Sequence, residues 1–273
     1  MKIDETGSRR KLSKRKDPEA AVSYYHEKGI PIEAVKLYLT TIANSNFESW
    51  YDANKDKNID DFKLDFKKIS ASGTLFDIDK LLNISKNYIS RLKAVEVYEE
   101  TLKWAEEFDP ELSDLLIKYK DYCISIFNIE REQKKPRKDY SCYSDIRNQI
   151  WYMFDELFNI KENVYANIEI KEYYNSEMLM DYITNYYSST DSKDEWYSKI
   201  KDLAIKHGFA GEVKMYKEDP DKYLGHVGDV CEFIRVASTS LTMTPDLYEI
   251  LKLLGSERIR ERFNNFNELL NKK

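Results

Sequence analysis

A short basic stretch near the start of the chain carries the residue types with the clearest chemistry. Lys11 and Lys14 lie three positions apart around Ser13, with arginines on both sides and a helix start directly after them. An ammonium group is a compact point charge on a flexible stem, so two of them suit the neutralisation of negative charge that develops in a reaction. The serine hydroxyl can add a hydrogen bond. A run of like charges is also typical of a solvated tail, which is the plainer interpretation of this stretch.

The order of these residues is more specific than their charge. Residues 11–15, Lys-Leu-Ser-Lys-Arg, resemble the Lys-Met-Ser-Lys-Ser/Arg loop of class I aminoacyl-tRNA synthetases, and glutamyl-tRNA synthetases commonly carry the loop in this form. In that family an amino-acid carboxylate attacks the α-phosphate of ATP and pyrophosphate leaves, while the loop closes over the β- and γ-phosphates like a lid. The resemblance implies catalytic roles for Lys14, Lys11 and Ser13, and phosphate binding by Lys14 and Arg15.

Later parts of the chain resemble the same family in the same order. The similar segments are residues 21–23, 29–34, 38–39, 76–81, 88–89, 235–237, 244–250 and 253–258. The resemblance implies the C-terminal portion of a glutamyl-tRNA synthetase. Its expected parts are the end of the catalytic domain with the signature loop (1–17), a stem-contact region (18–90) and two helical anticodon-binding subdomains (91–187 and 188–273).

The second signature of a class I synthetase, His-Ile-Gly-His ahead of the loop, does not occur in this sequence. Residues 225–229, Gly-His-Val-Gly-Asp, come nearest, but they follow the lysine loop and no strand precedes them, so we predict a helix-start turn there. From the resemblance we expect the whole enzyme to join glutamate to tRNA(Glu) with ATP and Mg²⁺, with tRNA(Gln) as a further candidate substrate. We expect this chain alone to bind tRNA, to be inactive and to hold no cofactor.

The overall charge limits the kinds of partner. The formal net charge is −6, which argues against a generic nucleic-acid coat and against DNA binding, so an RNA must meet local basic patches. Residues 2–16 are such a patch, with seven basic and two acidic side chains. Residues 134–138, Lys-Lys-Pro-Arg-Lys, form a second basic turn, for which a solvated loop is favoured over a contact with RNA phosphates.

Cysteine use and hydropathy indicate a reducing compartment. Cys123, Cys142 and Cys231 are odd in number and form no Cys-x-x-Cys pair, which excludes a sequence-local zinc site and a disulfide framework. We expect buried free thiols and no metal site. No apolar run approaches the length of a membrane span, so we expect a soluble, cytoplasmic protein without a membrane partner.

The composition favours helices. With 8 Gly and 6 Pro among 273 residues, we predict a mainly α fold in which a helical stem-contact region precedes a multi-helix anticodon-binding domain of two subdomains. Apolar spacing predicts helices at 91–108 and 110–131, the first with Leu92, Val95, Leu102 and Ala105 on its core stripe. A weak alternation over residues 60–69 is compatible with a short strand.

Residues with strong local preferences mark several helix ends. Asp17 is predicted to cap a helix that has Pro18 at its first position and ends at Gly29. Further predictions are helices near 143–159 and 168–187, a linker at 188–191, a capping box from Ser192 to Glu195, helix stops at Gly208 and Gly255, and a helix start at Thr244-Pro245.

A free-standing helical RNA-binding or interaction protein is the alternative to the synthetase interpretation. In that alternative the lysine loop is only a basic N-terminal tail. Both interpretations predict salt-dependent RNA affinity, but only the synthetase predicts a preference for one tRNA.

Overall fold

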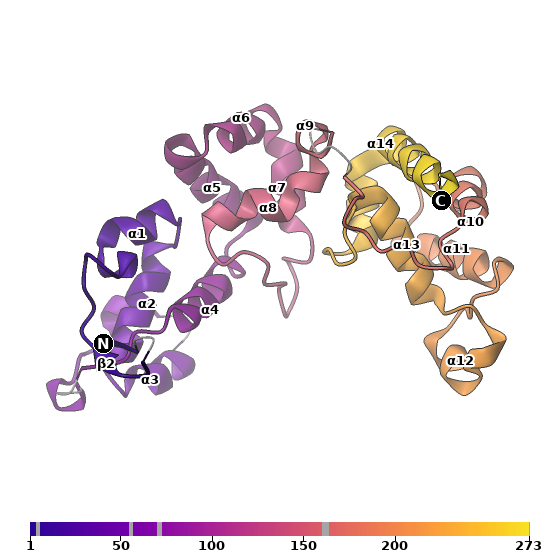
Figure 1. The fold of residues 1–273 in the computed structure, drawn as a ribbon. Helices are drawn as coiled ribbons and strands as arrows, with labels where there is room; N and C mark the ends of the chain where they lie inside the picture. The colour runs from indigo at the N-terminus through magenta and orange to yellow at the C-terminus, as the bar shows by residue number, and fades with distance from the viewer. Residues whose placement is uncertain (4–5, 55–56, 70–72, 160–163, 273) are drawn as a thin grey trace. The chain divides into compact units, whose positions relative to one another are not determined.

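The computed structural model describes residues 1–3, 6–54, 57–69, 73–159 and 164–272 (Figure 1). This part of the chain is mainly helical, which confirms the predicted fold class. Its only strands are β1 (Lys2–Ile3) and β2 (Arg9–Arg10), which pair in antiparallel register. The chain forms two compact units, Met1–Gln149 and Ile150–Lys273, and each is described by itself below.

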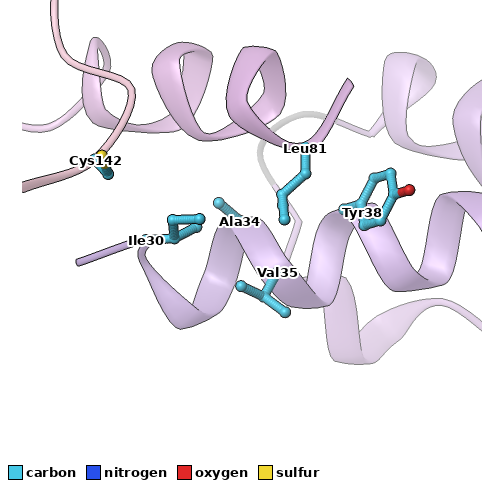
Figure 2. Close-up of a cluster of buried hydrophobic side chains, with 6 residues drawn as sticks. All are labelled: Ile30, Ala34, Val35, Tyr38, Leu81 and Cys142. Carbon is cyan, nitrogen blue, oxygen red and sulfur yellow. The ribbon is translucent and has the colours of Figure 1, made fainter. Parts of the chain in front are cut away.

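The first unit begins with helices packed around a small core. After a 3₁₀ turn (Pro18–Ala20), its elements are α1 (Val22–Glu27), α2 (Ile32–Ala43), α3 (Phe47–Ala53) and α4 (Ile78–Ile89). Figure 1 shows α2 and α4 side by side, and Figure 2 shows Leu81 of α4 facing Ala34 and Tyr38 of α2. Ile30, Val35 and Cys142 complete this buried cluster. The cluster joins α2 and α4 to a loop from much later in the sequence.

The predicted strand within residues 60–69 is wrong. The chain makes two 3₁₀ turns there, Ile59–Asp61 and Phe66–Lys68, because the side chains of Asn58 and Asp65 accept hydrogen bonds from backbone N–H groups two residues later. Phe66 is 83% exposed, so the apolar alternation has no buried face to which it could correspond. Local side-chain hydrogen bonds therefore decide the conformation of this segment.

The second part of the first unit is a helical bundle. Its elements are α5 (Ala94–Phe108), α6 (Pro110–Lys118), α7 (Lys120–Asn128), a 3₁₀ turn (Tyr143–Asp145) and α8 (Ile146–Ile150), which extends to the first residue of the second unit. The helix predicted over 110–131 is broken at Tyr119, which has φ −122°. The predicted core stripe of α5 is partly wrong, since Val95 is exposed. Its buried positions are Ala105, as predicted, and also Ala94, Val97, Tyr98 and Thr101.

The second unit consists of helices of unequal length. They are a 3₁₀ turn (Trp151–Met153), α9 (Asp155–Phe158), α10 (Ser176–Asp181), a π-helical turn (Tyr182–Tyr186), α11 (Lys193–Lys206), α12 (Val213–Glu218), a 3₁₀ turn (Pro220–Lys222), α13 (Val227–Thr239) and α14 (Leu247–Asn271). The helix expected near 168–187 begins only at Ser176, and the region near 143–159 holds several short helical pieces. The proposed linker at 188–191 lies inside this unit.

Several predicted helix ends are confirmed. Ser192 and Glu195 form the capping box of α11. Gly208 follows the end of that helix with φ +84°, and Gly255 interrupts α14 with φ +77°. The start predicted at Thr244-Pro245 is shifted, because Asp246 is the residue that caps α14. These signals are local, so the sequence reports them well.

A buried arginine joins three segments of the second unit. Arg262 is 3% exposed and donates hydrogen bonds to the carbonyl oxygens of Tyr152 (2.7 Å) and Ser238 (2.8 Å). Its guanidinium also contacts the carboxylate of Asp155 at 3.1 Å and lies 3.9 Å from the centroid of the Phe158 ring. The charged, planar guanidinium of Arg262 therefore makes both hydrogen bonds and a cation–π contact inside the core.

The three cysteines are free thiols. Cys123 and Cys142 are buried, and Cys231 is half-buried. Burial raises the pKa of Cys123 to about 12, and it raises the pKa of Cys142 and of Cys231 to about 11. Across the described ranges, no helix is both long enough and apolar enough to pass through a bilayer.

Candidate functional site

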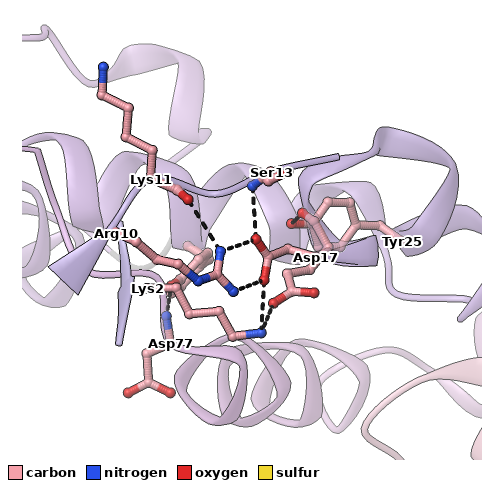
Figure 3. A network of polar contacts seen from close by, with 9 residues as sticks. Lys2, Arg10, Lys11, Ser13, Asp17, Tyr25 and Asp77 are labelled. Carbon is pink, nitrogen blue, oxygen red and sulfur yellow. Dashed lines mark hydrogen bonds and ion pairs between the residues drawn. The ribbon is translucent and has the colours of Figure 1, made fainter. Parts of the chain in front are cut away.

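The strand pair β1–β2 places the basic stretch at the surface of the first unit. Lys2 pairs with Arg10 across the two strands, and residues 11–17 continue directly from β2 (Figure 3). The chain then enters the 3₁₀ turn Pro18–Ala20, whose proline has the backbone angle that a helix start requires. The lysine loop is thus held between a strand and a helical turn, which is more structure than the solvated tail considered from the sequence would have.

One buried carboxylate organises the loop. Asp17 has no exposed side-chain surface, and its two oxygens accept hydrogen bonds from the guanidinium of Arg10 at 2.6 and 2.7 Å (Figure 3). The ammonium group of Lys2 lies 3.5 Å from the same carboxylate. The hydrogen bonds from Arg10 and from the backbone of Ser13, together with these charges, hold the pKa of Asp17 well below its usual range. A buried ionised carboxylate is tolerated because it is paired and hydrogen-bonded.

Hydrogen bonds to Ser13 close the loop into a tight turn. The N–H of Ser13 donates to the carboxylate of Asp17 at 2.8 Å, while the N–H of Asp17 donates to the carbonyl oxygen of Ser13 at 2.8 Å. The N–H of Lys16 donates to the same carbonyl oxygen at 3.0 Å. Lys14 and Arg15 therefore lie inside a turn whose first and last residues are joined twice.

The cations of the turn face solvent. Lys11, Lys14, Arg15 and Lys16 are all exposed, and Figure 3 shows the ammonium group of Lys11 directed away from the network around Asp17. Within the described residues, none of these four side chains is recorded in an ion pair. Asp17 is the nearest acidic residue in sequence, but Arg10 and Lys2 already neutralise it. The turn thus presents several free cations at one surface, an arrangement suited to a polyanion such as a chain of phosphates.

Neighbouring contacts fix the base of the loop. Lys2 also forms an ion pair with Glu19, and this hydrogen bond raises the pKa of the Lys2 ammonium. The hydroxyl of Tyr25 in α1 donates to the carbonyl oxygen of Glu19. The ion pair thereby joins the 3₁₀ turn to β1, and the hydrogen bond from Tyr25 joins the same turn to α1.

The structure places Ser13, Lys14 and Arg15 on one turn, with Lys11 two residues before it, and their roles stay predictions. Asp17 does stand at the N-cap position, but its predicted capping hydrogen bond is absent. Its carboxylate binds Arg10 and the backbone of Ser13 instead. The supporting roles of Arg10 and Lys2 were not predicted from the sequence. An acid that ends a run of cations is the only local signal that could have indicated them.

Two other candidate segments have structural roles. His226 is the N-cap of α13, where its Nδ1 accepts a hydrogen bond from the N–H of Gly228 at 3.0 Å and its own N–H donates to Asp229 at 2.7 Å. The near match at 225–229 is therefore a helix start, as predicted. In the basic turn at 134–138, Arg137 forms ion pairs with Glu130 and Asp139, so part of its charge is neutralised.

Comparisons with known proteins identify relatives of the whole chain. The chain is 44% identical over 262 residues to a glutamate–tRNA ligase of Acetivibrio thermocellus and 43% identical over 269 residues to one of Clostridium perfringens, which covers 96% and 97% of this chain. The chain spans about half the length of these relatives, 47% and 48% respectively, and corresponds to their C-terminal half. No family model matches the sequence.

Solved structures support the fold. A crystal structure of a glutamate tRNA ligase from Elizabethkingia meningosepticum, in complex with its amino acid, superposes with a TM-score of 0.60 at 15% identity. The superposition covers 99% of this chain and 50% of that one. A glutamate–tRNA synthetase structure from Elizabethkingia anophelis gives a TM-score of 0.61 over 98% of this chain and 49% of that one. The chain therefore has the fold of about half of such a protein, and the predicted resemblance is confirmed.

Proposed function

Because this chain is a relative of glutamate–tRNA ligases over nearly all of its length, we propose that it is the tRNA-binding, C-terminal portion of an enzyme that attaches glutamate to tRNA(Glu). The observation that supports this proposal is the hydrogen-bonded turn at residues 13–17, whose exposed cations include Lys14 and Arg15 of the predicted signature loop. ATP is the proposed energy source, with Mg²⁺ as the usual companion of its phosphates, and tRNA(Gln) is a second candidate substrate. The cytoplasm is the proposed compartment.

The roles of the loop residues follow from their chemistry. Lys14 and Lys11 neutralise the charge that develops as pyrophosphate leaves, and the hydroxyl of Ser13 adds a hydrogen bond. Lys14 and Arg15 bind the ATP phosphates. Lys14 and Arg15 are exposed, and hydrogen bonds fix the backbone of their turn. Their side chains can therefore contact a phosphate chain while the backbone of the turn keeps its conformation.

The division of labour along the chain is also part of the proposal. Residues 1–17 would end the catalytic domain, 18–90 would contact the tRNA stem, and 91–187 and 188–273 would form two anticodon-binding subdomains. We expect the amino-acid pocket and most of the ATP site in the half of the ligase that this chain does not match. The chain by itself should then bind tRNA(Glu) without supporting glutamate-dependent ATP–pyrophosphate exchange.

Rapid-mixing measurement of adenylate formation tests the role of the loop. In the complete ligase, Lys14→Ala should lower the activation rate by about 10²–10³-fold, the loss typical of one preorganised electrostatic donor. The affinity for tRNA should change little, because the proposed stem and anticodon contacts lie in later segments. An unchanged activation rate would end the catalytic interpretation and leave the stretch as a basic tail.

A binding measurement tests the tRNA-binding portion separately. The purified chain should bind tRNA(Glu) more tightly than an unrelated tRNA at the same salt concentration. Equal affinity for the two tRNAs, with the same salt dependence, would instead support a general RNA-binding protein.

A further inference from the structure

The contacts around Asp17 suggest a role beyond charge balance. Its carboxylate is the only described group that contacts both Arg10 before the lysine motif and the backbone of Ser13 inside it. Since the side chain is fully buried, it is out of reach of a substrate. Any influence on a reaction must therefore pass through the residues of the turn.

The turn transmits the position of Asp17 to Lys14. Ser13 immediately precedes Lys14, and it is bonded to Asp17 through both its N–H and its carbonyl oxygen. Only Lys14, Arg15 and Lys16 lie between the two bonded residues. With both ends of so short a segment fixed, the direction in which the Lys14 stem leaves the backbone is restricted. A lysine stem is flexible, so fixing its base reduces the conformational entropy lost when the ammonium binds.

The neutralisation of Asp17 matters for the same reason. An unpaired carboxylate three positions from Lys14 would compete with a phosphate for the lysine ammonium group. Arg10 occupies both carboxylate oxygens, and Lys2 lies 3.5 Å away. The acid that shapes the turn is thereby prevented from neutralising the cations that the turn displays.

We propose that Asp17 is a positioning residue for Lys14: by joining Arg10 to the backbone of Ser13, it sets the turn that presents the Lys14 ammonium to the ATP phosphates. This inference depends on the function proposed above. Asp17 itself touches neither ATP nor tRNA. Its contribution is to hold Lys14 in place, and a displacement of a reacting or stabilising group by about 1 Å can cost as much as 10²-fold in rate.

A double-mutant cycle in the complete ligase tests this role. Asp17→Asn should lower the rate of adenylate formation by about 10–10²-fold, with little change in the KM for ATP or in tRNA affinity. In a Lys14→Ala background the same substitution should cost almost nothing more, because its effect passes through Lys14. A purely structural role predicts equal losses in both backgrounds, and that result would overturn the proposal. Asp246→Asn, which alters a helix cap in the second unit, is the control, and its effect on adenylate formation should be the same with and without Lys14→Ala.

Two further measurements keep the test informative if Asp17→Asn folds poorly. Arg10→Lys keeps the positive charge but loses the two-pronged contact, so it should give a smaller loss of the same kind. In the purified chain, hydrogen exchange at the Ser13 amide should be faster in Arg10→Lys than in the wild type, and unchanged exchange there would contradict the proposal. If Lys14→Ala alone leaves activation intact, the proposed function of the loop fails. If Lys14→Ala slows activation but Asp17→Asn does not, only the positioning role fails.

Discussion

The backbone N–H of Tyr143 donates a hydrogen bond of 2.9 Å to the carbonyl oxygen of Gly29, and thereby ties the turn before α8 to the end of α1. Gly29 has φ +65°, and a Cβ atom there would lie 2.8 Å from Cβ of Tyr143 and 2.9 Å from Cδ1 of Trp104. The indole N–H of Trp104 donates to the carbonyl oxygen of Glu27 at 3.1 Å. The end of α1 is thus packed directly against α5 and the 3₁₀ turn before α8.

Gly29→Ala should destabilise the first unit by about 2–4 kcal/mol, because it adds both backbone strain and a steric clash. Gly208→Ala is the matched control. Gly208 also follows a helix end with positive φ, but its nearest neighbour would be an ordinary contact, Cδ1 of Leu224 at 3.5 Å. Its cost should be about 1 kcal/mol, from the backbone alone. Urea unfolding of both variants measures the difference in unfolding free energy. Equal losses would show that the close contacts of Gly29 with Tyr143 and Trp104 add nothing to the cost.

Arg262→Met should cost about 3 kcal/mol in unfolding free energy. Methionine has an unbranched side chain like that of arginine, but it cannot donate the two buried hydrogen bonds that Arg262 makes to the carbonyl oxygens of Tyr152 and Ser238. Arg258 also contacts Asp155 but is 30% exposed, so Arg258→Met should cost about 1 kcal/mol or less. Thermal unfolding of the two variants provides the comparison, and similar losses would argue against a special role for the buried fork of Arg262.

Asp181 should make the second unit sensitive to acid. Burial raises the pKa of its carboxyl group, but hydrogen bonds from Lys206, Asn185 and His207 outweigh burial and lower the pKa from 3.8 to about 2. Because the folded-state pKa is the lower one, the stabilisation is complete above about pH 4 and is lost as the pH falls towards 2. Asp181→Asn should therefore cost about 1 kcal/mol near pH 6, after allowance for solvent screening of the exposed Lys206, and almost nothing near pH 2. A pH-independent difference in unfolding free energy would contradict this assignment.

Lys14→Arg in the complete ligase should restore only part of the activation rate lost in Lys14→Ala. A planar guanidinium carries the same charge, but it cannot reproduce a compact ammonium on a flexible stem. Adenylate formation measured for the three proteins should therefore rank wild type, arginine and alanine in that order. Full activity of the arginine variant would mean that charge alone is required at this position.

The sequence predicted best those features that depend on neighbouring residues. The capping box at Ser192 and Glu195, the helix stop at Gly208 and the helix start at His226 are each decided within a few residues, so their side chains and backbone preferences indicate them directly. The prediction of the lysine loop depends on the same kind of local signal, because its residue types occur in a fixed order.

Features that depend on distant contacts were predicted less well. The buried stripe of α5 includes Val97 instead of Val95, because the packing partners of that helix, not its own apolar residues, decide which face is covered. The pairing of Asp17 with Arg10 and Lys2 requires the two strands to pair. The basic run itself does not indicate that Arg9 and Arg10 pair with Lys2 and Ile3. Supporting residues of a site are therefore harder to find in a sequence than the residues they support.

The low reactivity of the three native thiols makes selective labelling of the loop feasible. At neutral pH, thiols whose pKa lies near 11 or 12 hold very little of the thiolate that reacts with maleimides, and Cys123 and Cys142 are also buried. Arg15→Cys would introduce an exposed thiol on the turn without disturbing the contacts of Asp17. A dye attached there would report in real time when a ligand binds near the turn, and the native cysteines would need no replacement.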